Sequence, residues 1–331
     1  MAPKVDSMDV TTQARIGNTA SAVGSVVVLL RNLVDYAGLF PPASLGMPAA
    51  VANYEAYSRS EFSWMLGRFI VPAARLGEFE DARACLSGSR TETPSRWGLS
   101  ALLGADVAAD LARIRDFNAR CAADHLPIAP QIESVEVKVT GAEEVRRLSE
   151  IIPAELETYF ETPLSGGVTD GGARAARDCV SAVAACGKRA KIRTGGETAD
   201  KFPSPESVIE FITLCSATGV PFKATAGLHH PLRSLHRLTY HPDSPSGIMH
   251  GFLNVFLAAA FMRVVLEPSR AIELLCEQAA EAFCFEPDAL RWREHRLMVR
   301  DLFQTRRDFA ISFGSCSFTE PIDDLRSLHL L

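Results

Sequence analysis

The sequence lacks the cysteine spacing of a metal-binding or disulfide-stabilised domain. Its eight cysteines include no C-x-x-C pair, which removes the usual zinc-site pattern. A chain of 331 residues also does not need the disulfide framework that holds small secreted domains together. We therefore interpret the cysteines as reduced and mostly buried thiols, and we expect a cytoplasmic location.

No apolar run is long enough to cross a bilayer. The longest candidate, residues 251–268, contains Asn254 and Arg263, and it falls short of the roughly 20 residues that a spanning helix needs. The apolar residues 26–30 are too few for the core of a secretory signal. We expect no contact with membranes, and we predict that the polar, small-residue-rich segment 1–24 is disordered.

An excess of positive charge is also absent. The net charge is −6, so the overall balance does not favour nucleic acid as a partner. No G-x-G-x-x-G follows an early strand, and neither G-x-S-x-G nor H-E-x-x-H occurs. These absences argue against a dinucleotide-binding fold, a serine-hydrolase nucleophile turn and a zinc-protease helix.

The chain instead alternates between strand-like and helix-period segments. Helical crossovers between strands indicate a parallel sheet, and eight such units predict a (β/α)8 barrel. An open doubly wound sheet is the alternative. The expected strands cover residues 33–42, 63–73, 97–104, 128–139, 156–164, 190–196, 221–228 and 309–318.

This alternation stops after the seventh expected strand. Residues 229–308 contain a loop rich in His and Pro, followed by helical patterns over 247–266, 268–284 and 287–304. We therefore predict one barrel domain over residues 25–331, with 229–308 as a helical insertion between strands 7 and 8.

In a barrel of this kind, the functional site lies at the carboxyl ends of the strands. Ionisable residues accumulate at the expected strand ends, namely Asp35, Arg68, Glu133 or Glu136, Glu161, Lys191, Arg193, Lys223, His229 and His230. Glu133 and Glu136 are three residues apart, so at most one of them faces the barrel interior unless a bulge intervenes. Glu161 is either an acid/base residue or the partner of a lysine.

The two lysines carry the most specific chemistry. Lys191 shares a strand face with Arg193, and Lys223 shares one with Thr225. Burial and a nearby cation both lower the pKa of a lysine, and a neutral amine can attack a carbonyl to form a Schiff base. The alternative is that the lysines face outward, or that they form structural ion pairs with Glu161 and Glu157.

Two further groups of residues are candidates for ligand binding. The segment "GSCS" contains Gly314, Ser315 and Ser317 and precedes a helix, an arrangement whose backbone N–H groups can hold a phosphate or carboxylate. A metal site formed by the histidines 229, 230 and 250 with Glu161 or Asp35 is one interpretation, but their spacing matches no ligand motif. We therefore favour hydrogen-bonding or acid/base roles for them.

Taken in order, these segments resemble the deoxyribose-phosphate aldolase family, which comprises class I aldolases on a (β/α)8 barrel. "KIRTG" resembles the family's "KTSTG" and places the Schiff-base lysine at Lys191, and "KATAG" resembles "KASGG" and places the second lysine at Lys223. "QIESV" resembles "EIDMV" and puts Glu133 at the catalytic acid. "LVDYAGLFPP", "YFETPL" and "SFGSCS" resemble further strands of the family.

The departures from the family pattern concern the substrate more than the lysine pair. Glu157 stands where the family has a strand-5 lysine, and Arg193 replaces a small residue. Arg193 can bind a carboxylate with two parallel hydrogen bonds, which indicates a keto acid or another oxyanion; the alternative is a salt bridge to Glu161 or Glu157. The resemblance thus implies retained carbonyl chemistry on a different substrate.

The sequence therefore predicts a Schiff-base aldolase or lyase that acts on a small carbonyl compound with an anionic group. We expect neither a cofactor nor a metal, and a homo-oligomer is compatible with the pattern. A metal-dependent lyase or hydrolase and a non-catalytic anion-binding barrel are the alternatives. The predicted catalytic residues are Lys191, Lys223, Glu133 and Glu161, and the predicted substrate-binding residues are Asp35, Arg68, Arg193, Thr194, Gly227, His229, His230, His250, Asn254, Gly314, Ser315 and Ser317.

Overall fold

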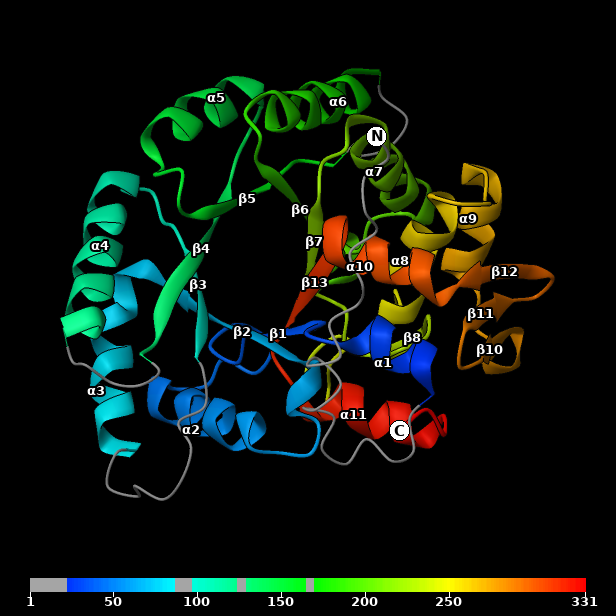
Figure 1. Ribbon diagram of the computed structural model, residues 1–331, viewed down its shortest axis with the longest axis horizontal. Helices are drawn as coiled ribbons and strands as arrows, with labels where there is room; N and C mark the ends of the chain where they lie inside the picture. Colours follow the sequence, from blue (N-terminus) through cyan, green and yellow to red (C-terminus); the bar gives the residue numbers. More distant parts are fainter. Residues whose placement is uncertain (1–22, 87–96, 124–128, 165–169) are drawn as a thin grey trace, which may run out of the picture.

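The chain folds into a closed barrel of eight parallel strands (Figure 1). The computed structural model describes residues 23–86, 97–123, 129–164 and 170–331. Around the barrel the strands follow the order β1-β13-β7-β6-β5-β4-β3-β2, which confirms the (β/α)8 prediction. The barrel strands are β1 (Val34–Tyr36), β2 (Leu66–Pro72), β3 (Gly98–Leu102), β4 (Gln131–Lys138), β5 (Glu157–Glu161), β6 (Arg189–Arg193), β7 (Phe222–Thr225) and β13 (Ala310–Ser315).

Helices follow the strands and surround the barrel in Figure 1. α7 shows how the sequence sets their bounds: its N-cap Ser204 accepts a hydrogen bond from the Ser207 N–H, Pro205 occupies the first turn, and Gly219 ends the helix in the left-handed conformation. The helices outside the insertion are α1 (Gly24–Leu30), α2 (Met47–Ser58), α3 (Leu76–Leu86), α4 (Val107–Ala123), α5 (Ala142–Ile151), α6 (Asp170–Ala185), α7 (Pro205–Thr218) and α11 (Thr319–Ser327).

The insertion 229–308 combines helices with two small antiparallel sheets. A hairpin of β8 (Ser234–Arg237) and β9 (Ser246–Met249) comes first, and it is followed by α8 (Phe252–Met262) and α9 (Pro268–Cys276). α8 covers the outside of the barrel, because Phe252 stacks on Phe313 with ring centroids 5.1 Å apart. The remaining elements are β10 (Phe283–Phe285), β11 (Ala289–Trp292), β12 (His295–Met298) and α10 (Val299–Asp308).

All three helices predicted in this insertion are shorter than expected. The one expected over 247–266 spans only Phe252–Met262, and its first residues belong to β9. The helix expected over 268–284 ends at Cys276, and the first half of the one expected over 287–304 is the hairpin β11–β12. Trp292 pairs with His295 across a two-residue turn in which Arg293 adopts a φ of 51°. Strand pairing that buries Leu290, Trp292 and Leu297 outweighs the local helical period.

The interior of the barrel is unusually polar. Barrels of this type are generally filled with layers of branched apolar side chains. Here the inward positions of the strands carry ion pairs, formed by Asp35, Arg68, Glu136, Glu157, Glu161, Arg189, Lys191 and Lys223. Buried charges are retained only where they are paired and hydrogen-bonded, so this network marks the barrel interior as the place to look for function.

Two predictions concern the chain outside the barrel. Residues 1–22 of the segment expected to be disordered lie outside the described residues. Across the described ranges, none of the helices is both long and apolar enough to span a bilayer.

Candidate active site

Lys191 and Lys223 lie side by side inside the barrel. They are partners in the parallel register of β6 and β7, which places their backbones about 4.8 Å apart. Lys191 is 5% exposed and Lys223 is 2% exposed. The outward-facing alternative is therefore wrong for both residues.

One carboxylate joins the two ammonium groups. Glu136 binds Lys191 Nζ through Oε2 at 2.8 Å and Lys223 Nζ through Oε1 at 3.3 Å. Ser100 Oγ also donates a hydrogen bond to Oε1 at 3.0 Å, and Ser134 Oγ donates to Ser100. The Glu136 carboxylate is therefore fixed in position by two cations and a chain of hydroxyl groups.

Each lysine has a second acidic partner. Lys191 Nζ lies 3.1 Å from Glu161 Oε2, and Lys223 Nζ lies 2.7 Å from Asp35 Oδ2. Asp35 also accepts hydrogen bonds from the Arg68 N–H and from Ser312 Oγ, at 2.7 Å each. The ammonium of Lys223 further lies 4.5 Å from the ring centroid of Tyr159, a distance typical of a cation–π contact.

These carboxylates reverse the expected pKa shift of the lysines. Burial alone would lower the pKa of Lys191, but Glu136 and Glu161 together raise it above its ordinary value. Burial acts in the same way on Lys223, and there Asp35 and Glu136 raise the pKa. Burial would raise the pKa of Glu136, but the two lysines lower it. The prediction that the pKa values of the two lysines are lowered is therefore wrong, because the three carboxylates outweigh the effect of burial.

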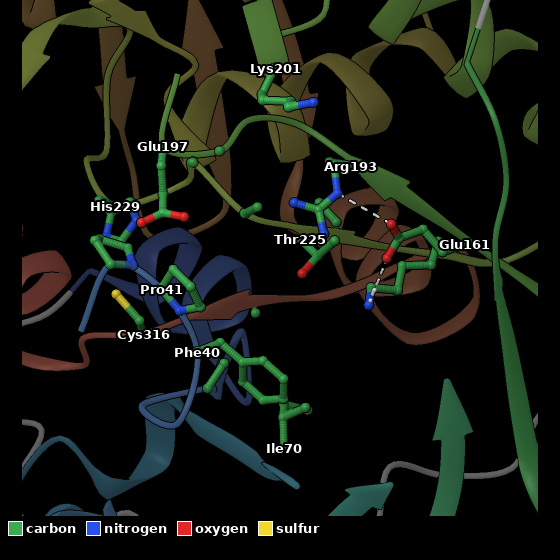
Figure 2. A pocket seen from close by; sticks show the side chains of 18 of the residues that line it. Phe40, Pro41, Ile70, Glu161, Arg193, Glu197, Lys201, Thr225, His229 and Cys316 are labelled. Atoms are coloured by element: carbon green, nitrogen blue, oxygen red, sulfur yellow. Dashed lines mark hydrogen bonds and ion pairs between the residues drawn. The ribbon is translucent and has the colours of Figure 1, made fainter. Parts of the chain in front are cut away.

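The lysines form the floor of a cavity of about 380 Å³ at the carboxyl ends of the strands. Phe40, Pro41 and Ile70 contribute an apolar wall, as Figure 2 shows, and Leu238 and Met249 reach it from the hairpin β8–β9 of the insertion. A cavity with charged groups at its floor and apolar walls is typical of a small-molecule site.

Arg193, Lys201 and Glu197 stand around the cavity at the end of β6 and in the loop that follows (Figure 2). Arg193 Nε lies 3.2 Å from Glu161 Oε1, which is the predicted alternative of a salt bridge, yet 49% of the Arg193 side chain is exposed. Glu161 thus binds Lys191 with one oxygen and Arg193 with the other. The Arg193 side chain therefore forms the ion pair with Glu161 and still has access to the cavity.

Glu133 and Arg68 do not belong to this cavity. The Glu133 carboxylate lies 3.9 Å from Arg68 Nη2, and Arg68 also binds Glu157 at 2.7 Å. Arg68 and Glu157 line a second cavity at the amino-terminal mouth of the barrel. Arg68 stands near the start of β2 rather than at its end, so its predicted placement at the carboxyl-terminal mouth of the barrel is wrong. Glu136 takes the position expected for Glu133.

The three predicted histidines are held apart. His229 lines the cavity, and its Nδ1 lies 3.1 Å from Glu320 Oε2. His230 pairs with Asp324 at 2.6 Å and stacks on His236. His250 Nε2 donates to the Pro203 carbonyl at 2.8 Å. Among the described residues, no group of three or more His, Cys, Asp or Glu is placed to hold a metal ion.

Several predicted binding residues support the backbone rather than the cavity. Thr194 donates from its hydroxyl to the Ala226 carbonyl at 2.7 Å, which ties the end of β6 to the end of β7. The Asn254 side chain donates to the carbonyls of Leu274 and Glu277 and accepts from the Arg233 N–H, so it joins segments of the insertion.

Only part of the segment that was predicted to bind an anion, residues 314–317, lines the cavity. Gly227 and Gly314 line the cavity, and so does Cys316. Ser315 Oγ accepts from the Ser317 N–H at 3.3 Å, and Ser317 Oγ accepts from the Glu320 N–H at 3.1 Å. The two hydroxyl groups thus serve the turn that begins α11.

Sequence reasoning did not identify several residues that contribute to the site. Ser100 and Tyr159 contact the ion network, and Phe40, Ile70 and Lys201 line the cavity. The sequence offers a signal for Ser100, which is the polar residue of the otherwise apolar strand β3, whereas Tyr159 lies among the polar residues of β5. Lys201 follows the strand in a loop, where no periodicity points to it.

No protein-family model, no curated protein and no solved structure matches the chain.

Proposed function

We propose that the protein is a Schiff-base aldolase or lyase that acts on a small carbonyl substrate with an anionic group. The observation that supports it is a pair of buried lysines that share the Glu136 carboxylate at the floor of an accessible cavity. Buried ionisable groups clustered in a pocket on this fold favour a catalytic role. The resemblance to the deoxyribose-phosphate aldolase family supports the same chemistry.

In this proposal, Lys191 is the nucleophile. Its ammonium first passes a proton to Glu136, whose Oε2 lies 2.8 Å away. The neutral amine then adds to the substrate carbonyl carbon, and the carbonyl oxygen becomes the hydroxyl of a carbinolamine. Glu136 returns its proton to this hydroxyl, which leaves as water while the nitrogen lone pair forms the C=N bond of the iminium.

The iminium then acts as the electron sink for the carbon chemistry. Cleavage of the bond between the α and β carbons, in which a β-hydroxyl group passes its proton to Glu136 and its carbon leaves as an aldehyde or ketone, sends the electron pair toward the iminium nitrogen and forms an enamine. Transfer of an α C–H proton to Glu136 forms an enamine in the same way. Lys223 remains an ammonium because Asp35 binds it at 2.7 Å, and it keeps Glu136 ionised between proton transfers. Glu161 positions Lys191 from the opposite side.

Reductive trapping tests the proposal directly. Borohydride added in the presence of pyruvate or glyceraldehyde should fix the adduct as a stable secondary amine on the peptide that contains Lys191. Lys191→Met should abolish the mass increase. Lys138→Arg is the matched control, because Lys138 is an exposed lysine on β4, and it should leave trapping unchanged.

The alternatives predict different results. A protein that gives no adduct with any carbonyl compound but binds small anions would be a non-catalytic barrel. Metal that remains stoichiometric after dialysis would favour a metal-dependent enzyme. An adduct on Lys223 in place of Lys191 would exchange the roles of the two lysines.

A further inference from the structure

The loops after barrel strands 7 and 8, with the start of the next helix, form the place where barrel enzymes frequently bind a phosphate group. Here these elements are the loop after β7 with His229, the turn after β13 with Cys316 and Ser317, and the first turn of α11. The hydrogen-bond donors of these elements would suit the anionic group of a bound ligand, because a helix N-terminus favours negative charge.

The protein's own Glu320 already occupies one of these donors, His229. Its carboxylate Oε2 accepts from His229 Nδ1 at 3.1 Å and from the Tyr240 hydroxyl at 2.8 Å, and its N–H is bound by Ser317 Oγ. Burial would raise the pKa of Glu320, but the hydrogen bond and charge of His229 lower it, so the group is a carboxylate. An internal carboxylate is thus bound to His229, next to the expected phosphate position.

Besides the two buried lysines at its floor, the cavity is lined by the cationic side chains of Arg193, at the end of β6, and Lys201, in the loop that follows. Arg193 is bound to Glu161 through Nε, and its Nη2 has no ion-pair or hydrogen-bond partner among the described residues. Lys201 lines the same cavity, 60% of its side chain is exposed, and its nearest acidic oxygen belongs to Asp200 at 3.9 Å. Figure 2 shows both cations on the same side, with Glu197 and His229 across the cavity.

From this arrangement we infer that the substrate is an unphosphorylated oxo acid whose carboxylate is bound by Arg193 and Lys201, and that Glu320 excludes phosphorylated compounds. This inference rests on the proposed function for the role of the carbonyl group. The planar guanidinium matches a carboxylate. Glu197 and Glu320 repel a second anionic group on the other side.

The apolar wall fits the remainder of such a substrate. Phe40 and Ile70 line the cavity on the side opposite Lys201 in Figure 2. A cavity of about 380 Å³ holds a small molecule with one charged end. The carbonyl carbon then meets Lys191, and an alkyl or aryl substituent contacts the apolar wall.

The test measures anion binding by calorimetry with racemic lactate, which carries the carboxylate but has no carbonyl to react with Lys191. Wild-type protein should bind lactate saturably and inorganic phosphate at least tenfold more weakly. Arg193→Gln and Lys201→Gln should each weaken lactate binding at least fivefold. Lys138→Arg, at an exposed lysine outside the cavity, should bind lactate like the wild type.

The proposed role of Glu320 is tested by a variant that should bind inorganic phosphate more tightly. Glu320→Ala opens the position, so the affinity for inorganic phosphate should rise at least tenfold, while lactate binding stays within twofold. Thermal unfolding verifies that Glu320→Ala is folded. The Lys201→Gln variant, which changes an exposed residue, tests the carboxylate site without relying on Glu320→Ala. Wild-type protein that fails to bind lactate, or that binds phosphate equally well, overturns the inference.

These outcomes separate the inference from the proposed function. Lactate binding that depends on Arg193, without any trapped adduct from pyruvate, would retain the carboxylate site and reject the Schiff base. A trapped adduct on Lys191 from glyceraldehyde, without lactate binding, would retain the Schiff base and reject the carboxylate site.

Discussion

Lys191 and Lys223 occupy paired positions on β6 and β7, and their ammonium groups bind different oxygens of one carboxylate, that of Glu136. Two like charges so close together would repel each other strongly in a buried site. The arrangement is stable because Glu161 and Asp35 each add a second negative partner. The two carboxylates beside Lys191 therefore favour its ammonium form, so the proposed mechanism requires this group to lose a proton before it attacks a carbonyl.

The first prediction concerns the pH dependence of Lys191 reactivity. The pKa of Lys191 is raised above its ordinary value, so its neutral fraction increases about tenfold per pH unit throughout the range below about 10.4. The rate of adduct formation, measured by borohydride trapping and mass spectrometry, should rise from pH 7 to pH 10 without a plateau. A plateau below pH 9 would show that the pKa is lowered instead.

Glu161→Gln provides the companion measurement. This variant removes one of the two carboxylates that stabilise the ammonium of Lys191 but leaves the other, Glu136, in place. The pH profile of trapping should therefore shift toward lower pH relative to the wild type. An unchanged profile would mean that Glu161 does not control the ionisation of Lys191.

The second prediction concerns the stability contributed by Glu136. Glu136→Gln leaves two buried ammonium groups with one carboxylate each, and removing one partner of a buried ion pair costs about 3 kcal/mol. The free energy of unfolding, measured with urea at pH 7, should fall by about this amount. Glu78→Gln breaks the exposed ion pair with Arg75 and is the control; it should leave the stability unchanged within error.

The stability of Glu136→Gln should also differ from that of the wild type in its dependence on acidic pH. The pKa of Glu136 is lowered in the folded protein, so its stabilising contribution is complete above its unfolded value near 4.3 and is lost as the pH falls below that value. The stability of the wild type should decrease between about pH 5 and pH 3 more steeply than that of Glu136→Gln. Parallel curves would contradict the lowered pKa.

The barrel and its lysine pair were predictable from sequence because they depend on local periodicity. Alternation along residues 189–193 and 222–225 places Lys191 and Lys223 on inward faces, and the parallel register then brings them together. Glycine turns and intervening helices indicated the strand order. These signals need no knowledge of distant contacts.

The choice between Glu133 and Glu136 was not predictable in the same way. The register between β3 and β4 shifts after Leu99, where Ile132 and then Ser134 are the successive partners, so Glu133 is the extra residue of an irregular pairing. Such a shift arises from contacts between strands and leaves no mark in the local sequence. The hairpin β11–β12 was missed because Trp292 is held by residues outside the hairpin: its Nε1 donates to Glu277 at 3.3 Å, and Arg270 lies 5.6 Å from its ring centroid.

The third prediction concerns Glu157, which stands where the resemblance places a family lysine. Its carboxylate binds Arg68 and Arg189 at 2.7 Å each, at the amino-terminal mouth of the barrel. Glu157→Gln should therefore leave adduct formation on Lys191 within twofold of the wild type. The free energy of unfolding should fall by about 1 kcal/mol, because the ion pairs are partly exposed. A large loss of trapping would place Glu157 in the catalytic network.

The fourth prediction concerns the close approach of β6 and β7 beyond the lysines. Gly227 has a φ of 71°, and a Cβ there would lie 2.8 Å from Gly195 Cα and 2.7 Å from the Phe202 ring. Gly219 has a similar φ of 67°, but a Cβ built there would have no atom within 4 Å. An alanine at this position therefore measures the cost of the backbone conformation alone. Gly219→Ala should lower the free energy of unfolding by about 1 kcal/mol.

Gly227→Ala should lower it by about 3 kcal/mol, because steric overlap with the backbone adds to the conformational cost. The overlap also separates the strand ends that Thr194 ties together, so trapping on Lys191 should slow in Gly227→Ala but not in Gly219→Ala. Urea unfolding and adduct kinetics check both effects. Equal losses of stability in the two variants would show that β6 and β7 tolerate a wider separation at the mouth of the cavity.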